Sequence, residues 1–137
     1  MTLDELYNSL PNGLHDAMVH SVTIDYSKRQ ARFDTSVWVG DLDSKDAEVR
    51  EAYRDGELVL NDVGYYIVET PDPTYPYYGI DNITIDTGNI KSLTKPPYVK
   101  LPPAQEGMLV NWIYVYEWNS FIYVSSRSAE LHWNDET

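Results

Sequence analysis

The segment from Met108 to Trp133, MLVNWIYVYEWNSFIYVSSRSAELHW, decides the fold class. Its first half alternates aromatic and β-branched residues at a period of two, which is typical of a β-strand. One face of that strand would carry Trp112 and Tyr114, and the opposite face Ile113 and Val115. Because both faces are largely apolar, we expect both to be covered by other parts of the protein.

The rest of the chain repeats this pattern in shorter pieces between turn signals. Further strands are expected at residues 22–26, 31–39, 58–60, 64–69, 80–86, from 121 onward, and 129–133. A total of seven or eight strands favours a mainly β fold, either an antiparallel β-sandwich or a closed barrel. An α+β fold is the alternative, and the pattern does not separate these architectures.

A short helix is expected at the N-terminus. Thr2 and Glu5 have the spacing of a capping box, and Leu3, Leu6 and Leu10 form an apolar stripe. A helix of this length is not stable alone, so we expect the stripe to cover the β core. The 137 residues are predicted to form a single domain, 1–137.

The composition limits the cellular setting and the chemistry. The chain contains no cysteine, which excludes disulfides and thiol catalysis. The first ten residues lack the basic start and apolar run of a signal peptide, and no segment has the length of a membrane span. We therefore expect a cytoplasmic protein without a membrane partner.

Negative charge is concentrated in one part of the chain. The formal net charge is −12, and residues 41–86 alone carry a net charge of −9. A nucleic-acid-binding protein needs lysine and arginine to displace counterions, so the sequence argues against that class. An acidic surface suits a basic protein partner. The candidate contacts are Glu48, Glu51, Asp55 and Glu57, which we expect in a polar segment outside the strands.

Catalytic signatures are missing from the sequence. It has no glycine-rich phosphate loop, no HExxH and no Gly-x-Ser-x-Gly motif. A metal site or an unrecognised active site could draw on His15, Asp16 and His20, because imidazole and carboxylate are ordinary ligands. The competing interpretation places Asp16 in a turn and makes His20 a hydrogen-bonded core residue. We therefore predict no catalytic residues, no metal and no cofactor.

Two groups of aromatic residues are candidate binding surfaces. Tyr75, Tyr77 and Tyr78 lie in a proline-rich loop, where restricted side chains suit a protein interface. Alternatively, this loop folds back and buries its rings. Trp112 and Tyr114 either line a ligand cavity or fill the core of the sheet.

Short pieces spread over nearly the whole chain resemble a family of small uncharacterised bacterial proteins. The pieces are LPNGLHDA at 10–17, IDY at 24–26, VETPDP at 68–73, YPY at 75–77, EWNSFI at 117–122 and AEL at 129–131. The family implies no assigned activity. The His-Asp-Ala start is also similar to one found among immunity proteins of bacterial toxin systems.

These observations favour a non-enzymatic protein that works by binding. The leading hypothesis is an interaction protein of immunity type with a basic protein partner. The alternative is a small-ligand-binding barrel, or an enzyme that uses the aromatic face with His15, Asp16 and His20. A filled interior with a flat patch would favour the first, and a deep pocket lined by Trp112 or Tyr114 the second. The sequence leaves a homodimer open.

Overall fold

The computed structural model describes residues 1–75 and 80–136. All of its strands pair antiparallel in one sheet with the order β4-β7-β6-β5-β1-β2-β3-β8. Their bounds are β1 Ala17–Asp25, β2 Gln30–Trp38, β3 Tyr53–Asn61, β4 Tyr65–Val68, β5 Ile83–Asn89, β6 Leu109–Val115, β7 Ser120–Ser126 and β8 Ser128–Trp133.

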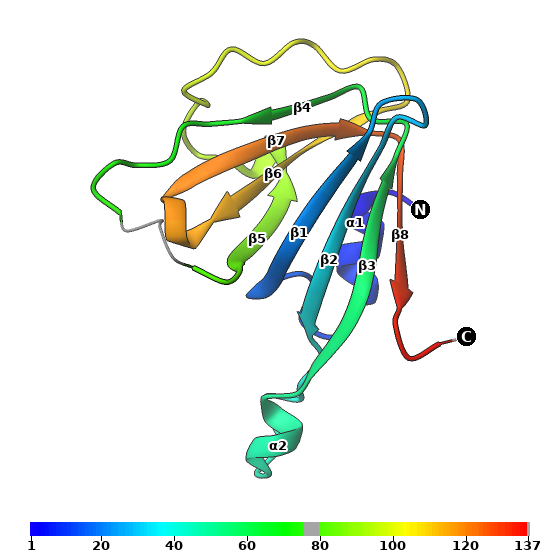
Figure 1. Cartoon of the computed structure of the whole chain (residues 1–137), viewed down its shortest axis with the longest axis vertical. Helices are drawn as coiled ribbons and strands as arrows, with labels where there is room; N and C mark the ends of the chain where they lie inside the picture. The colour runs from blue at the N-terminus through cyan, green and yellow to red at the C-terminus, as the bar shows by residue number, and fades with distance from the viewer. Residues whose placement is uncertain (76–79, 137) are drawn as a thin grey trace.

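The mainly β class and the strand number are therefore confirmed. The architecture is one open sheet, because β4 and β8 form its two edges. The joint between β1 and β5 is only three residue pairs long. At this joint the sheet changes direction, so that β4, β7 and β6 run across the ends of β1, β2 and β3 (Figure 1). We call the face that carries the hydrophobic core the core face, and the opposite side the outer face.

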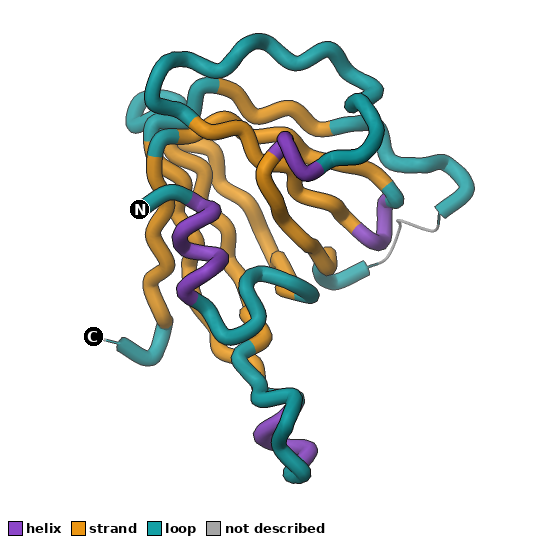
Figure 2. Tube along the Cα trace, turned by 180° about the vertical axis from the view of Figure 1, so that it is seen from behind, coloured by secondary structure: helices purple, strands orange, loops and turns teal. Residues whose placement is uncertain are grey.

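Helix α1, Leu3–Ser9, covers the core face, as its sequence predicted (Figure 2). The capping box is present, and Leu3 and Leu6 are buried against the strands. Asp4 fixes the helix to the sheet, because its carboxylate accepts hydrogen bonds from Asn89 (2.8 Å) and Asn111 (2.9 Å). The buried core comprises Leu3, Leu6, Leu14, Ala17, Val19, Ala31, Phe33, Val37, Leu58, Leu60, Ile85, Ile113, Val115, Ile122, Val124 and Ala129.

The faces of β6 correct the expectation that Trp112 and Tyr114 fill the core. Ile113 and Val115 belong to the core, so the two aromatic side chains point to the outer face. Trp112 packs over Gly88, its partner on β5, where an added Cβ would lie 2.4 Å from the indole ring. The indole N–H donates to Ser92 Oγ at 2.9 Å, in the 3-10 helix η1, Ile90–Ser92. The segment that follows η1 (yellow in Figure 1) arches past β7 and β4.

A bulge in β1 overturns the prediction of a core histidine. The register with β2 shifts between Val19 and Ser21, which leaves His20 as the extra residue. Val19 and Ile24 are five positions apart, so in a regular strand they would point to opposite faces. Because of the bulge, both lie on the core face. His20 is instead exposed on the outer face.

β2 and β3 extend beyond the rest of the sheet and carry helix α2, Ala47–Arg50, at their tip (Figure 1). β3 begins at Tyr53, five residues before the strand predicted at 58–60. Asp55 and Glu57 therefore lie within a strand, which corrects their expected position in a polar segment outside the strands. No helix in the described ranges is long and apolar enough to cross a bilayer.

Candidate functional site

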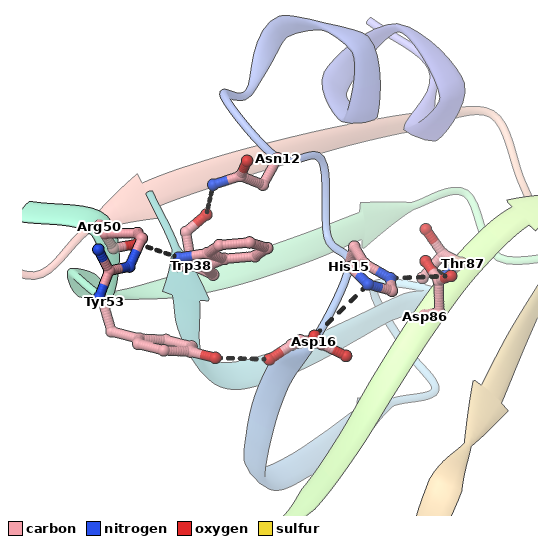
Figure 3. Close-up of polar contacts among 8 residues, drawn as sticks. All are labelled: Asn12, His15, Asp16, Trp38, Arg50, Tyr53, Asp86 and Thr87. Carbon is pink, nitrogen blue, oxygen red and sulfur yellow. Dashed lines mark hydrogen bonds and ion pairs between the residues drawn. The ribbon is translucent and has the colours of Figure 1, made fainter. Parts of the chain in front are cut away.

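His15 lies between two carboxylates near the joint of the sheet (Figure 3). Its Nδ1 is 3.2 Å from Asp86 Oδ2, and its Nε2 is 3.4 Å from Asp16 Oδ2. Pairing of Ala17 with Ile85 brings the start of β1 beside β5 and so places His15 against Asp86. Asp16 has a left-handed backbone with φ 58°, a conformation that aspartate tolerates better than most residues.

Polar contacts from β2 and β3 hold this loop in place (Figure 3). The Tyr53 hydroxyl donates to the backbone carbonyl of Asp16 at 3.2 Å. The Asn12 side chain donates to the carbonyls of Gly40 (2.8 Å) and Trp38 (3.3 Å). Burial, together with the charge of Asp16, raises the pKa of Tyr53. The cluster therefore connects three parts of the chain and has a structural role.

The chemistry of this cluster is limited. An imidazole donates to two carboxylates at once only in its protonated form, so His15 can act as a bridging cation. Within the described ranges its polar partners are carboxylates, and no serine or threonine hydroxyl is among them. The arrangement lacks the nucleophile-and-base pair of covalent catalysis.

The structure separates the residues of the alternative metal site. His15 and Asp16 are together, but His20 Nε2 contacts Ser36 Oγ at 2.9 Å on the outer face. Ser36 in turn donates to Asp55 Oδ1 at 2.6 Å. No group of three or more histidine, aspartate or glutamate residues suited to a metal ion occurs in residues 1–75 and 80–136.

The candidate acidic residues divide between two places. Glu48 lies in α2 and Glu51 at its C-cap, and both are exposed. Asp55 and Glu57 lie on the outer face of β3. In addition, Asp34 on β2 and Glu130 on β8 are exposed on the same face. We call this set the acidic face: Asp34, Asp55, Glu57 and Glu130.

The tyrosine-rich loop is only partly described. Tyr75 is 40% exposed, while Tyr77 and Tyr78 lie outside the described residues. The preceding turn is built by Asp72, whose carboxylate accepts from the backbone N–H of Thr74 (2.9 Å) and the side chain of Asn119 (3.1 Å). The hydrogen bonds from Thr74 and Asn119 lower the pKa of Asp72.

The aromatic side chains of β6 and β7 line an open groove on the outer face. Tyr114, Phe121 and Tyr123 form one wall, and residues 93–98 form the other, around a volume of about 530 Å³. Trp112 lies outside this groove and lines a different, shallow hollow beside Asp4 and Tyr7. Hydrophobic side chains pack on the core face of the sheet, so the groove is a surface feature of the outer face.

Sequence reasoning missed Glu69, which lines this groove and is 5% exposed. It also missed Asp34 and Asp86. Their partners are 23 or more residues away in the chain, so only the strand register reveals them. The sequence signal for Glu69 was a carboxylate beside an apolar strand.

Comparison of the chain with protein-family models, with curated proteins and with solved structures gave no match.

Proposed function

We propose that this protein binds a basic protein partner through the acidic face. One observation carries the proposal: Asp34 and Glu57 stand directly opposite each other on neighbouring strands. Neither carboxylate has an ion pair within 4 Å among the described residues. Like charges in this position destabilise a sheet, so folding alone does not favour them.

The surroundings support a partner of opposite charge. Arg32, the arginine on the outer face of β2, is hydrogen-bonded to Gln30 Oε1 through its Nε (3.3 Å) and Nη2 (3.0 Å). Ser36 and Asn61 add polar side chains to the same face. A sheet surface of this kind offers several carboxylates in fixed positions, which suits the lysine and arginine side chains of a protein.

Helix α2 extends the negative charge beyond the sheet. Glu48 and Glu51 are exposed at the tip of the β2–β3 arm (Figure 1). Charges at this distance from the acidic face would attract a basic partner before contact and raise the association rate. A protein of immunity type that covers a toxin domain is the version we favour, in line with the resemblance at residues 10–17.

The competing proposal of an enzyme draws less support. It required His20 beside His15 and Asp16, and His20 is bonded to Ser36 instead. It also required the aromatic face of β6 to enclose a pocket, and that face borders an open groove.

The test uses two variants with the same change in net charge. The face variant is Asp34→Lys with Glu57→Lys, and the arm variant is Glu48→Lys with Glu51→Lys. A partner captured from the source cells by the wild-type protein is purified, and association and dissociation rates are measured at two salt concentrations.

Both variants should slow association, because long-range attraction depends on total negative charge and is screened by salt. Only the face variant should also speed dissociation, because only its residues would contact the partner. Equal dissociation from both variants, or association that does not depend on salt, would contradict the proposal.

A further inference from the structure

A second surface, separate from the acidic face, combines aromatic rings with buried acid. The groove lined by Tyr114, Phe121 and Tyr123 continues into a second hollow of about 420 Å³. The two hollows share Glu69, Tyr98 and Asn119 in their linings. We call the joined feature the aromatic groove. Its size falls in the range of binding sites for small groups and side chains.

Glu69 forms the acidic floor of the aromatic groove. Its Oε1 accepts from the backbone N–H of Phe121 (2.9 Å), and its Oε2 accepts from the hydroxyl of Tyr123 (3.1 Å). Both donors are neutral, and no lysine, arginine or histidine lies within 4 Å of this carboxylate in the described ranges. A buried carboxylate is costly unless it is paired, and it has about four acceptor sites, so further donors can bind.

The second hollow has further polar residues in its lining. Ser120 also lines this hollow, but its side chain lies on the face of β7 that carries Ile122, and its Oγ is buried. Asp72 adds a second carboxylate to the same hollow. The acceptor that this hollow offers to a cation is therefore Asp72 and not Ser120.

The walls of the groove favour a flat cation. The rings of Phe121 and Tyr123 are stacked with centroids 5.8 Å apart, and Tyr114 lies 5.0 Å from Phe121. Tyr98 is 98% exposed at the rim, so its ring is free to contact a ligand. The negative faces of aromatic rings attract cations, and a guanidinium also stacks on them.

We propose that the aromatic groove binds the guanidinium group of an arginine side chain. The planar guanidinium would stack on the aromatic wall and donate its N–H groups to Glu69. Lys95 also lines the groove, but it is exposed and makes no ion pair with Glu69 within 4 Å. The aromatic groove shares no residue with the acidic face, so either proposal can fail alone.

The experiment titrates the full chain with N-acetyl-arginine methylamide and follows backbone amide resonances by NMR. The citrulline analogue is the matched control, because it keeps the planar shape and the N–H donors but has no charge. Glu69→Gln removes the charge and keeps the acceptor for Phe121 N–H. Tyr98→Ser is the second variant, because its exposed ring is not needed for folding.

We expect saturable shifts at Ser120, Phe121 and Tyr123 with the arginine probe, and binding at least about tenfold weaker for Glu69→Gln or for citrulline. Tyr98→Ser should also weaken binding while its spectrum stays folded. Equal binding of the two probes would overturn the proposal. Unchanged affinity in Glu69→Gln, or the absence of saturable shifts in the wild-type protein, would also overturn it.

Discussion

Replacing Glu57 with lysine should stabilise the protein, because it turns a repulsive cross-strand pair into an attractive one. Asp34 and Glu57 are directly opposed in register on β2 and β3. Charges on such a pair are about 6 Å apart, where the Coulomb energy is about 0.7 kcal/mol in a water-like dielectric. Reversing one charge changes the sign of that energy. Side-chain motion and salt reduce the net gain to about 0.5–1 kcal/mol.

Urea unfolding measures this gain, and two controls isolate the pair. Glu51→Lys on the α2 arm changes the net charge by the same amount without contacting Asp34, so it corrects for the general effect of charge. The double variant Asp34→Lys with Glu57→Lys restores repulsion between two like charges. The double-mutant cycle should therefore show that the two stabilising single changes do not add.

A Glu57→Lys variant no more stable than Glu51→Lys would contradict repulsion between Asp34 and Glu57. Additivity of the two single changes within about 0.3 kcal/mol would contradict it as well. Asp34 and Glu57 would then lie too far apart to interact, and the central observation behind the acidic face would be lost.

Three further predictions concern the core, alkaline pH and metal. Ile113→Ala should lower the free energy of unfolding by about 2–5 kcal/mol, because Ile113 is 2% exposed in the core. A loss of less than about 1 kcal/mol in urea unfolding would contradict its inward orientation. Burial raises the pKa of Tyr66 from 10.0 to about 12, so its contribution is present below pH 10.0 and is lost as the pH rises towards about 12. That loss is about 3 kcal/mol, and Tyr66→Phe should flatten the pH dependence of stability over this range; an unchanged profile would place Tyr66 in solvent. Zinc should not raise the melting temperature, because His15 and His20 lie at separate sites; a rise that is lost in His20→Ala would show that they share a metal.

The sequence predicted local structure better than it predicted which face points inward. The capping box of Thr2 and the strands at 22–26 and 31–39 were recognised, because both signals depend on neighbouring residues. The two faces of β6 were harder to assign, because each is apolar. Asn111 is a polar residue in this apolar strand, yet it is 1% exposed and donates to Asp4 and to the carbonyl of Gly88.

Residues that depend on long-range pairing could not be placed from the sequence. Asp86 meets His15 across 71 positions, and Glu69 meets Tyr123 across 54. The bulge at His20 has no signal in the alternation of residues around it, and it moves that side chain out of the core. Period-two patterns locate strands, whereas register and bulges, which arise from tertiary pairing, decide which side chains meet.

The imidazole resonances of the three histidines test the proposed binding surface most directly. His20 is linked to Asp55 through Ser36, and His132 is opposite Glu57, so these two report on the acidic face. His15 reports on the separate cluster with Asp16 and Asp86. On addition of the captured partner, we predict shifts at His20 and His132 with little change at His15. A shift confined to His15 would contradict the account.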